Sequence, residues 1–170
     1  MSELRDVVIV SAKRTPVGSF QGVLSSISAP QLGSIVIKAL LEETHIDPVS
    51  VDEVIMGNIL SAGQGQAPAR QAALGAELPN SVECLTINKM CGSGMKAAML
   101  AHDHILAGSG RIAVAGGLES MSNAPYLLPK ARGGYRLGNG ELLDHMFVDG
   151  VEDAAVLQIC TRALIEAPCI

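Results

Sequence analysis

Residues 83–106 read ECLTINKMCGSGMKAAMLAHDHIL, an apolar stretch that passes through a glycine-rich turn into a longer apolar pattern. The first part, Glu83 to Asn88, predicts a short strand. Gly92-Ser93-Gly94 predicts a turn, and the apolar residues after it recur at helical spacing. Their common helical face comprises Met95, Ala98, Met99, His102, Ile105 and Leu106. A strand followed by a helix is the repeating unit of α/β proteins, so this stretch predicts that class of fold.

The same alternation extends to both sides of this stretch. Asp6 to Ala12 has apolar residues on both faces, as in a strand of a buried parallel sheet. Further strands are expected at 54–56 and 112–115, and helices at 30–43, 68–73 and 95–106. The resulting order, βαβαβαβ through about residue 118, predicts a mostly parallel sheet with helices on both faces.

The first expected helix carries its own start signal. Ser28 is followed three residues later by Gln31, which is a capping-box pattern. Pro30 lies in the first turn, where its missing N–H costs little. The apolar positions that follow helical spacing here are Leu32, Ile35, Val36, Ala39 and Leu40.

The remainder of the chain changes character twice. Residues 119–150 are rich in glycine and proline and lack periodicity, which indicates a long excursion, and such excursions tend to be functional. In the last segment, an amphipathic helical pattern comprises Val156, Ile159, Cys160, Ala163 and Leu164. We therefore expect an α/β domain over 1–118, the start of a loop region over 119–153 and a separate tail over 154–170.

The composition excludes several classes of protein. The 170 residues are 48% hydrophobic and 17% charged, so the chain is not a disordered one. The net charge is −5 without a basic run, and only two Phe, two Tyr and no Trp occur, which argues against nucleic-acid binding. No apolar run is long enough to span a membrane, and no export signal is visible. We expect a cytoplasmic protein with reduced thiols.

Cys91 is the strongest candidate for a reactive residue. It lies between an expected strand and an expected helix, where α/β proteins place their sites. The positive end of the following helix would favour thiolate over thiol, and the adjacent glycines allow a sharp turn and close approach of a substrate. A small cysteine buried in the core would have the same local pattern, so position alone leaves both interpretations open.

The other polar candidates have weaker signals. Cys84 is expected in the core, and the absence of a CxxC pair argues against a zinc or redox site. His102 is expected to pack on the apolar helical face, and the other histidines, His45, His104 and His145, have no local cluster around them. Glu119 could be a site carboxylate, although a residue in its position more often caps a turn. No cofactor-binding or metal-binding residue is expected.

Four motifs follow one another along the chain. The first, VIVSAKRTPVG (8–18), looks like the opening of a thiolase. The segment GQGQAPARQAA (63–73) resembles the family's dimer-interface stretch. NKMCGSGMK (88–96) resembles the surroundings of its acyl-accepting cysteine, and GGLESMS (116–122) follows at the family's distance. Together the four motifs resemble the thiolase family, and within it most of all the acetyl-CoA acetyltransferases.

The resemblance implies an acyltransferase that works through a cysteine thioester. Cys91 would take an acyl group from coenzyme A, and a second, deprotonated acetyl-CoA would attack that thioester; the reverse direction cleaves a 3-ketoacyl-CoA. The Cys91 backbone N–H would help to hold the thioester oxygen. Coenzyme A thioesters are substrates here, and no separate cofactor is implied. The resemblance also implies a homo-oligomer or association with a full-length thiolase subunit.

The resemblance ends near Asp153, and residues 154–170 contain no thiolase motif. The family's second half, which supplies an activating histidine and a second cysteine, is not matched. The chain thus resembles only the N-terminal half of a thiolase: its sheet would lack the last strand and keep an unpaired edge, and activity alone would be very low. Two alternatives remain open, a non-catalytic interaction fragment and another cysteine-dependent condensing enzyme such as a ketoacyl synthase.

Overall fold

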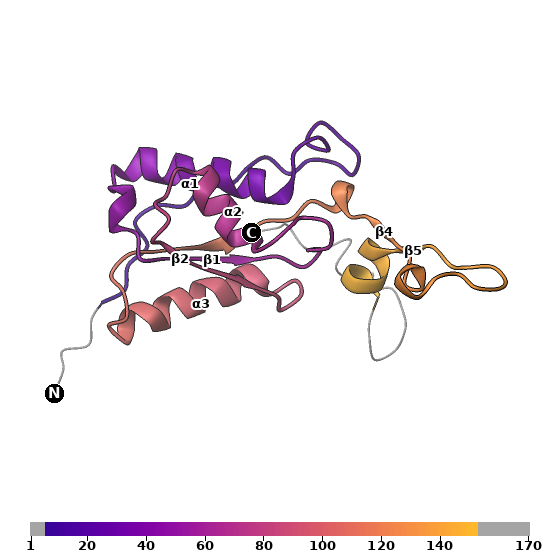
Figure 1. Ribbon diagram of the computed structural model, residues 1–170. Coiled ribbons are helices and arrows are strands. Elements are labelled where there is room, and N and C mark those ends of the chain that lie inside the picture. Colours follow the sequence, from indigo (N-terminus) through magenta and orange to yellow (C-terminus); the bar gives the residue numbers. More distant parts are fainter. Residues whose placement is uncertain (1–5, 153–170) are drawn as a thin grey trace.

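A computed structural model describes residues 6–152 as an α/β domain from which a looped arm extends (Figure 1). The sheet contains three parallel strands in the order β2-β1-β3: β1 is Glu53–Gly57, β2 is Glu83–Ile87 and β3 is Ala113–Gly117. Helices α1 (Ala29–Thr44) and α2 (Pro68–Gly75) cover one face, and α3 (Ser93–Leu106) covers the other. The expected α/β class, with helices on both faces of a parallel sheet, is confirmed.

The core is divided by the sheet into two apolar clusters, as the two-residue alternation of a strand requires. Val54 and Met56 of β1 face α1 and α2, where alanines of α2 pack closely against α1. Ile55 faces the opposite side and contacts Ala97 and Ala101 of α3. Within residues 6–152, no helix is both long and apolar enough to cross a membrane.

The helix α1 begins as its capping pattern predicts. The Ser28 hydroxyl accepts a hydrogen bond from the Gln31 N–H, and the Gln31 side chain accepts one from the Ser28 N–H. The buried face differs from the expected one, because it comprises Ala29, Pro30, Gly33 and Ile37. At Gly33 a Cβ would lie 3.0 Å from the Ala72 Cβ, so contact with α2 turns the smallest residues of α1 inward.

The expected strand at Asp6 to Ala12 does not form. This segment is extended but belongs to neither sheet, and its apolar side chains are exposed: Val8 by 71%, Ile9 by 90% and Val10 by 70%. A strand needs a hydrogen-bonded neighbour, and the described residues provide none for this segment. The apolar pattern of this segment therefore predicted a buried strand, and that prediction was wrong.

The prediction of which face of α3 is buried is also wrong. Ser93, Ala97 and Ala101 are buried against the sheet, whereas Met95 is 63% and Met99 59% exposed. Small side chains lie against β1 because they let the helix axis approach the strands closely. His102, expected on the packed face, is exposed as well.

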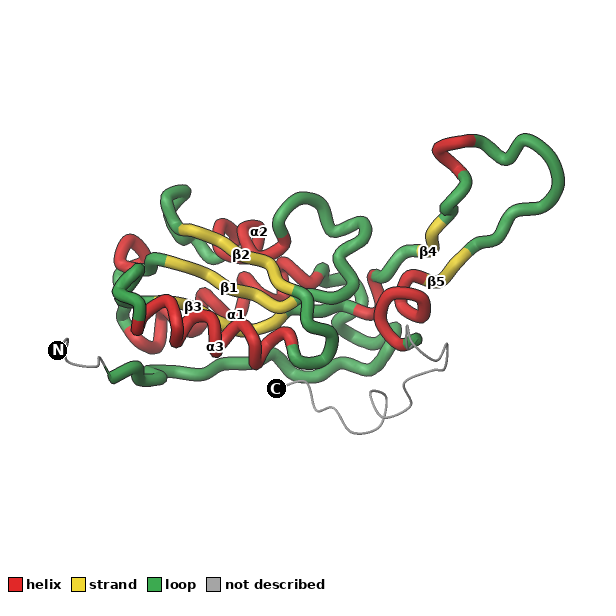
Figure 2. The backbone as a smooth tube through the Cα atoms, turned by 90° about the horizontal axis from the view of Figure 1, so that it is seen from below, coloured by secondary structure: helices red, strands yellow, loops and turns green. Residues whose placement is uncertain are grey.

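The arm beyond β3 contains little regular structure. Its two short antiparallel strands, β4 (Tyr126–Leu127) and β5 (Leu143–Asp144), close a long loop that projects from the domain (Figure 2). A π-helical segment, Phe147–Val151, then returns toward the domain. The amphipathic pattern expected after residue 154 lies outside the described residues.

Candidate active site

Cys91 lies in the loop that connects β2 to α3, at the carboxyl end of the parallel sheet. Its side chain is exposed, and the next residue, Gly92, is the N-cap of α3. No side chain caps this helix end, so the positive end of the helix is left beside Cys91. The structure thus places the predicted residue at the predicted kind of position.

The loop that holds Cys91 is fixed by short hydrogen bonds on both sides of it. The Ser93 hydroxyl accepts a 2.8 Å hydrogen bond from the Lys89 N–H and donates one of 2.6 Å to the Met90 carbonyl. The Asn88 side chain accepts a 2.9 Å bond from the Met90 N–H. Met90 itself has φ +48°, an unusual value for a residue that is not glycine. The chain therefore makes a sharp turn directly before Cys91.

The carboxyl ends of β1 and β3 meet the start of α3 through glycines. A Cβ on Gly117 would lie 3.8 Å from the Gly94 Cα and 3.5 Å from the Gly57 carbonyl oxygen. These glycines allow backbone to pack against backbone, which brings the start of α3, next to Cys91, against the ends of β1 and β3. The turn after β2 and the glycines that end β1 and β3 therefore act together to position one loop.

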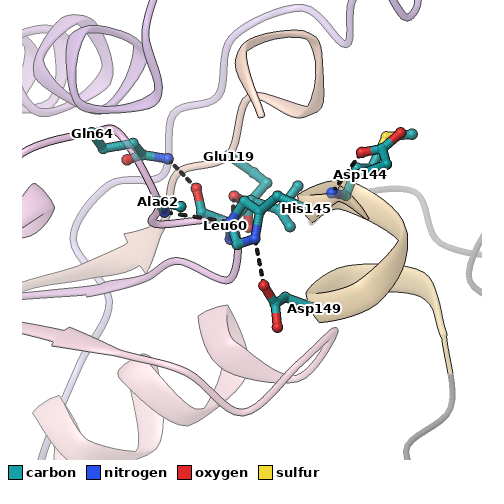
Figure 3. A network of polar contacts seen from close by, with 8 residues as sticks. Leu60, Ala62, Gln64, Glu119, Asp144, His145 and Asp149 are labelled. Carbon is teal, nitrogen blue, oxygen red and sulfur yellow. Dashed lines mark hydrogen bonds and ion pairs between the residues drawn. The ribbon is translucent and has the colours of Figure 1, made fainter. Parts of the chain in front are cut away.

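A half-buried carboxylate organises the chain that follows β1 (Figure 3). Glu119 accepts hydrogen bonds from the Ile59 N–H at 2.8 Å, the Leu60 N–H at 3.1 Å and the Asn58 side-chain amide at 2.9 Å. Burial raises the pKa of Glu119, while the two backbone hydrogen bonds act in the opposite direction. Glu119 therefore joins the ends of β1 and β3, and no described contact links it to Cys91.

The arm is attached to the same region by a histidine that the sequence did not single out. His145 is 5% exposed; its Nε2 accepts a 3.3 Å hydrogen bond from the Ala62 N–H, and its Nδ1 lies 2.6 Å from an Asp149 oxygen (Figure 3). Because Nε2 accepts a hydrogen bond, the proton of a neutral ring lies on Nδ1, and this N–H donates a hydrogen bond to Asp149. Only the i,i+4 spacing of His145 and Asp149 could have suggested this pair.

The remaining candidates lie away from Cys91 or at the opposite end of the strands. Cys84 is half-buried against the core, and burial raises the pKa of its thiol. His104 pairs with Glu53, at the start of β1, with 3.0 Å between Nδ1 and the carboxylate oxygen. Within residues 6–152, no side chain hydrogen-bonds to the Cys91 Sγ. The described site therefore comprises an exposed thiol and a helix end, and no described side chain is positioned as a base for that thiol.

A family model described as "Thiolase, N-terminal domain" matches residues 7–161. The chain belongs to the thiolase family. The match continues past Asp153, where the sequence resemblance was expected to end, and the proposed division of the chain at that point stays a prediction. The ketoacyl-synthase alternative finds no support in this match.

Individual thiolases and their relatives agree with the family match. An acetyl-CoA acetyltransferase of Cupriavidus necator is 57% identical over 150 residues, which are 88% of this chain and 38% of that protein. One of Schizosaccharomyces pombe is 57% identical over 149 residues, with the same shares of the two chains. A cytosolic one of Gibberella zeae is 52% identical over 154 residues, or 91% of this chain and 39% of that protein.

A solved thiolase structure has the same fold. The Acat5 thiolase of Ascaris suum, crystallised in complex with coenzyme A, matches with a TM-score of 0.82 and 43% sequence identity. The match covers 86% of this chain and 38% of that one. The chain therefore spans about two fifths of the length of the thiolases it matches, and the arrangement described above belongs to that part of the family fold.

Proposed function

We propose that this chain carries the nucleophile of an acyl-CoA C-acyltransferase, which condenses two acetyl-CoA molecules or cleaves a 3-ketoacyl-CoA. The observation that carries the proposal is the exposed Cys91 thiol beside the uncapped N-terminus of α3. The relatives named acetyl-CoA acetyltransferases and the coenzyme A complex of the Ascaris thiolase support the substrate class.

The chemistry assigned to this chain is one acyl transfer. The Cys91 Sγ, as thiolate, attacks the carbonyl carbon of acetyl-CoA; the new carbon–sulfur bond forms while the bond to the coenzyme A sulfur breaks. Coenzyme A leaves as a thiolate and takes up a proton, and the proton of Cys91 passes to solvent. The helix end stabilises negative charge on Sγ before attack, and the acyl group stays activated because it remains a thioester.

The proposal also covers the substrates, the association and the location of the protein. Acyl-CoA esters are substrates, and no metal or separate cofactor takes part. The chain associates with itself or with a longer thiolase subunit, as expected from the resemblance of residues 63–73 to the family's dimer-interface stretch. The cytosolic relative from Gibberella zeae supports a cytoplasmic location.

Mass spectrometry of protein incubated with acetyl-CoA tests the acyl transfer. We expect one acetyl group on the peptide that contains Cys91, removable by hydroxylamine as a thioester should be. The Cys91→Ala variant should acquire none, and the Cys84→Ala variant should match the wild type. Acetylation that persists in Cys91→Ala, or none in the wild type, would contradict the proposal.

A further inference from the structure

Ser93, the first residue of α3, holds the backbone on both sides of Met90 with one side chain. Its hydroxyl accepts a 2.8 Å hydrogen bond from the Lys89 N–H and donates one of 2.6 Å to the Met90 carbonyl. The same carbonyl accepts a 3.0 Å bond from the Ser93 N–H, which by itself closes the turn. Ser93 is only 5% exposed, so little water competes for these bonds. The Met90 carbonyl is therefore held twice by one residue.

The two bonds to the Met90 carbonyl determine the direction of the Cys91 N–H. The Met90–Cys91 peptide bond is trans and planar, so its C=O and its N–H point in opposite directions. Because the carbonyl points toward Ser93, the Cys91 N–H points away from Ser93. This N–H belongs to the residue whose thiol is exposed. One fixed peptide plane therefore sets where a hydrogen-bond donor lies relative to the Cys91 Sγ.

This peptide plane would rotate without the Ser93 hydroxyl, because Met90 is in an unfavourable conformation. Its φ of +48° lies in the left-handed region, which a residue other than glycine keeps only where the surrounding structure imposes it. Loss of the hydroxyl removes one of the two bonds to the Met90 carbonyl and the acceptor of the Lys89 N–H together. Met90 is then free to leave the left-handed region, and the Cys91 N–H turns with it.

We propose that Ser93 is a positioning residue for acyl transfer, whose hydroxyl directs the Cys91 N–H toward the oxygen on which negative charge develops. The inference rests on the proposed attack of the Cys91 Sγ on acetyl-CoA. As the carbon–sulfur bond forms, the carbonyl electron pair moves onto oxygen, and it returns when the bond to the coenzyme A sulfur breaks. The backbone N–H of a nucleophilic residue is suited to bind such an oxygen, and it stabilises the charge most when it is oriented beforehand.

Two reactions of the same thiol separate this role from a general loosening of the loop. Acetyl-CoA is attacked at a carbonyl carbon, where an oxyanion develops, whereas iodoacetamide is attacked at a saturated carbon, where none develops. Ser93→Ala removes the hydroxyl and keeps the Cβ that lies close to Gly57, and Ser93→Thr keeps the hydroxyl. Mass spectrometry gives the rates of both reactions at Cys91, and the pH profile of alkylation reports thiolate formation. Circular dichroism verifies that the variants fold.

In Ser93→Ala we expect acetylation of Cys91 to be at least about tenfold slower, because removal of an oxyanion donor costs about 10²–10³-fold and this donor is turned away. Alkylation should keep its pH profile and stay within about twofold of the wild-type rate, since the helix end beside the thiol remains. Ser93→Thr should retain the wild-type ratio of the two rates. Gly57→Ala, which displaces the start of α3, should slow both reactions.

Equal slowing of both reactions in Ser93→Ala would mean that Ser93 only holds the loop together, and it would overturn the inference. Unchanged acetylation in Ser93→Ala, or a ratio in Ser93→Thr as low as in Ser93→Ala, would overturn it too. Residual dipolar couplings of ¹⁵N-labelled protein measure the direction of the Cys91 N–H separately, and an unchanged direction in Ser93→Ala would also overturn it. A wild type that is not acetylated would contradict the proposed function, while these couplings would still test whether Ser93 orients the peptide.

Discussion

Ser93, the first residue of α3, packs directly onto Gly57, the last residue of β1. A Cβ added to Gly57 would lie 2.5 Å from the Ser93 Cβ and 2.8 Å from the Ser93 carbonyl carbon. The same serine fixes the Lys89–Met90 turn through its hydroxyl. The position of Cys91 therefore depends on a glycine that lies more than thirty residues earlier in the chain.

Substitution of Gly57 by alanine should displace the start of α3. Because backbone atoms occupy the space for the new methyl group, we expect a loss of about 1–3 kcal/mol in the free energy of unfolding. Urea unfolding measures this loss, and alkylation of Cys91 should slow in the same variant. Gly133→Ala is the matched control, since nothing lies within 4 Å of its added Cβ. Equal stability of the two variants would show that α3 shifts without cost.

Cys91 should alkylate faster than Cys84 in the folded chain at neutral pH. Its side chain is exposed beside a helix N-terminus, whereas Cys84 is half-buried and burial raises the pKa of the Cys84 thiol. We expect a rate at least about tenfold higher at Cys91 than at Cys84. Iodoacetamide labelling followed by peptide mapping measures both, with urea-unfolded protein as the reference. Similar rates in the folded protein would argue against an activated Cys91.

The contribution of Glu119 to stability should depend on pH. Burial raises its pKa above the ordinary value of 4.5, so the folded state holds the proton more tightly than the unfolded state. The associated stability is fully present below 4.5 and is lost as the pH rises through the folded pKa. Relative to Glu119→Gln, the wild type should therefore become less stable as the pH rises from 4 to 8.

Urea unfolding across this pH range measures the difference between the two proteins. Glu141→Gln, at an exposed position on the arm, should show no comparable pH dependence. If the difference between wild type and Glu119→Gln stayed constant, or increased with pH, hydrogen bonding rather than burial would dominate at Glu119.

Removal of the His145 side chain should loosen the attachment of the arm. His145→Ala leaves the Ala62 N–H without its acceptor and vacates a buried position. An unpaired buried N–H costs about 1–3 kcal/mol, so hydrogen exchange at Ala62 should accelerate by about 10- to 100-fold. His102→Ala is the control, because His102 is exposed and its polar partner among the described residues is its neighbour Asp103. Unchanged exchange at Ala62 would mean that other contacts hold the arm.

The 170-residue chain should not turn over acetyl-CoA or acetoacetyl-CoA at the rate of a longer thiolase. No described side chain is positioned as a base for Cys91, and acid–base catalysis typically contributes about 10²–10⁴-fold. Coenzyme A release measures turnover, with Cys91→Ala as the control. Turnover at a full thiolase rate that disappears in Cys91→Ala would show that this chain supplies its own base.

Local signals in the sequence determined the elements that surround the site. The capping residues Ser28 and Gln31 begin α1, Pro68 begins α2, and the turn at 88–92 leads from β2 into α3 with Cys91 at the boundary. These features could be predicted because each depends on hydrogen bonds and backbone geometry within a few residues.

Tertiary structure decided which surfaces are buried and which side chains meet. The methionines of α3 are as apolar as a core face requires, yet the alanines are buried because they allow α3 to approach β1 closely. Residues 6–12 have a strand pattern, but no strand within residues 6–152 pairs with them. The His145 ring accepts a hydrogen bond from the Ala62 N–H, 83 residues earlier in the chain. No pattern within a few residues of His145 could predict that contact. Pairing and burial are properties of the neighbours that the fold brings together, so the chain's own periodicity could not specify them.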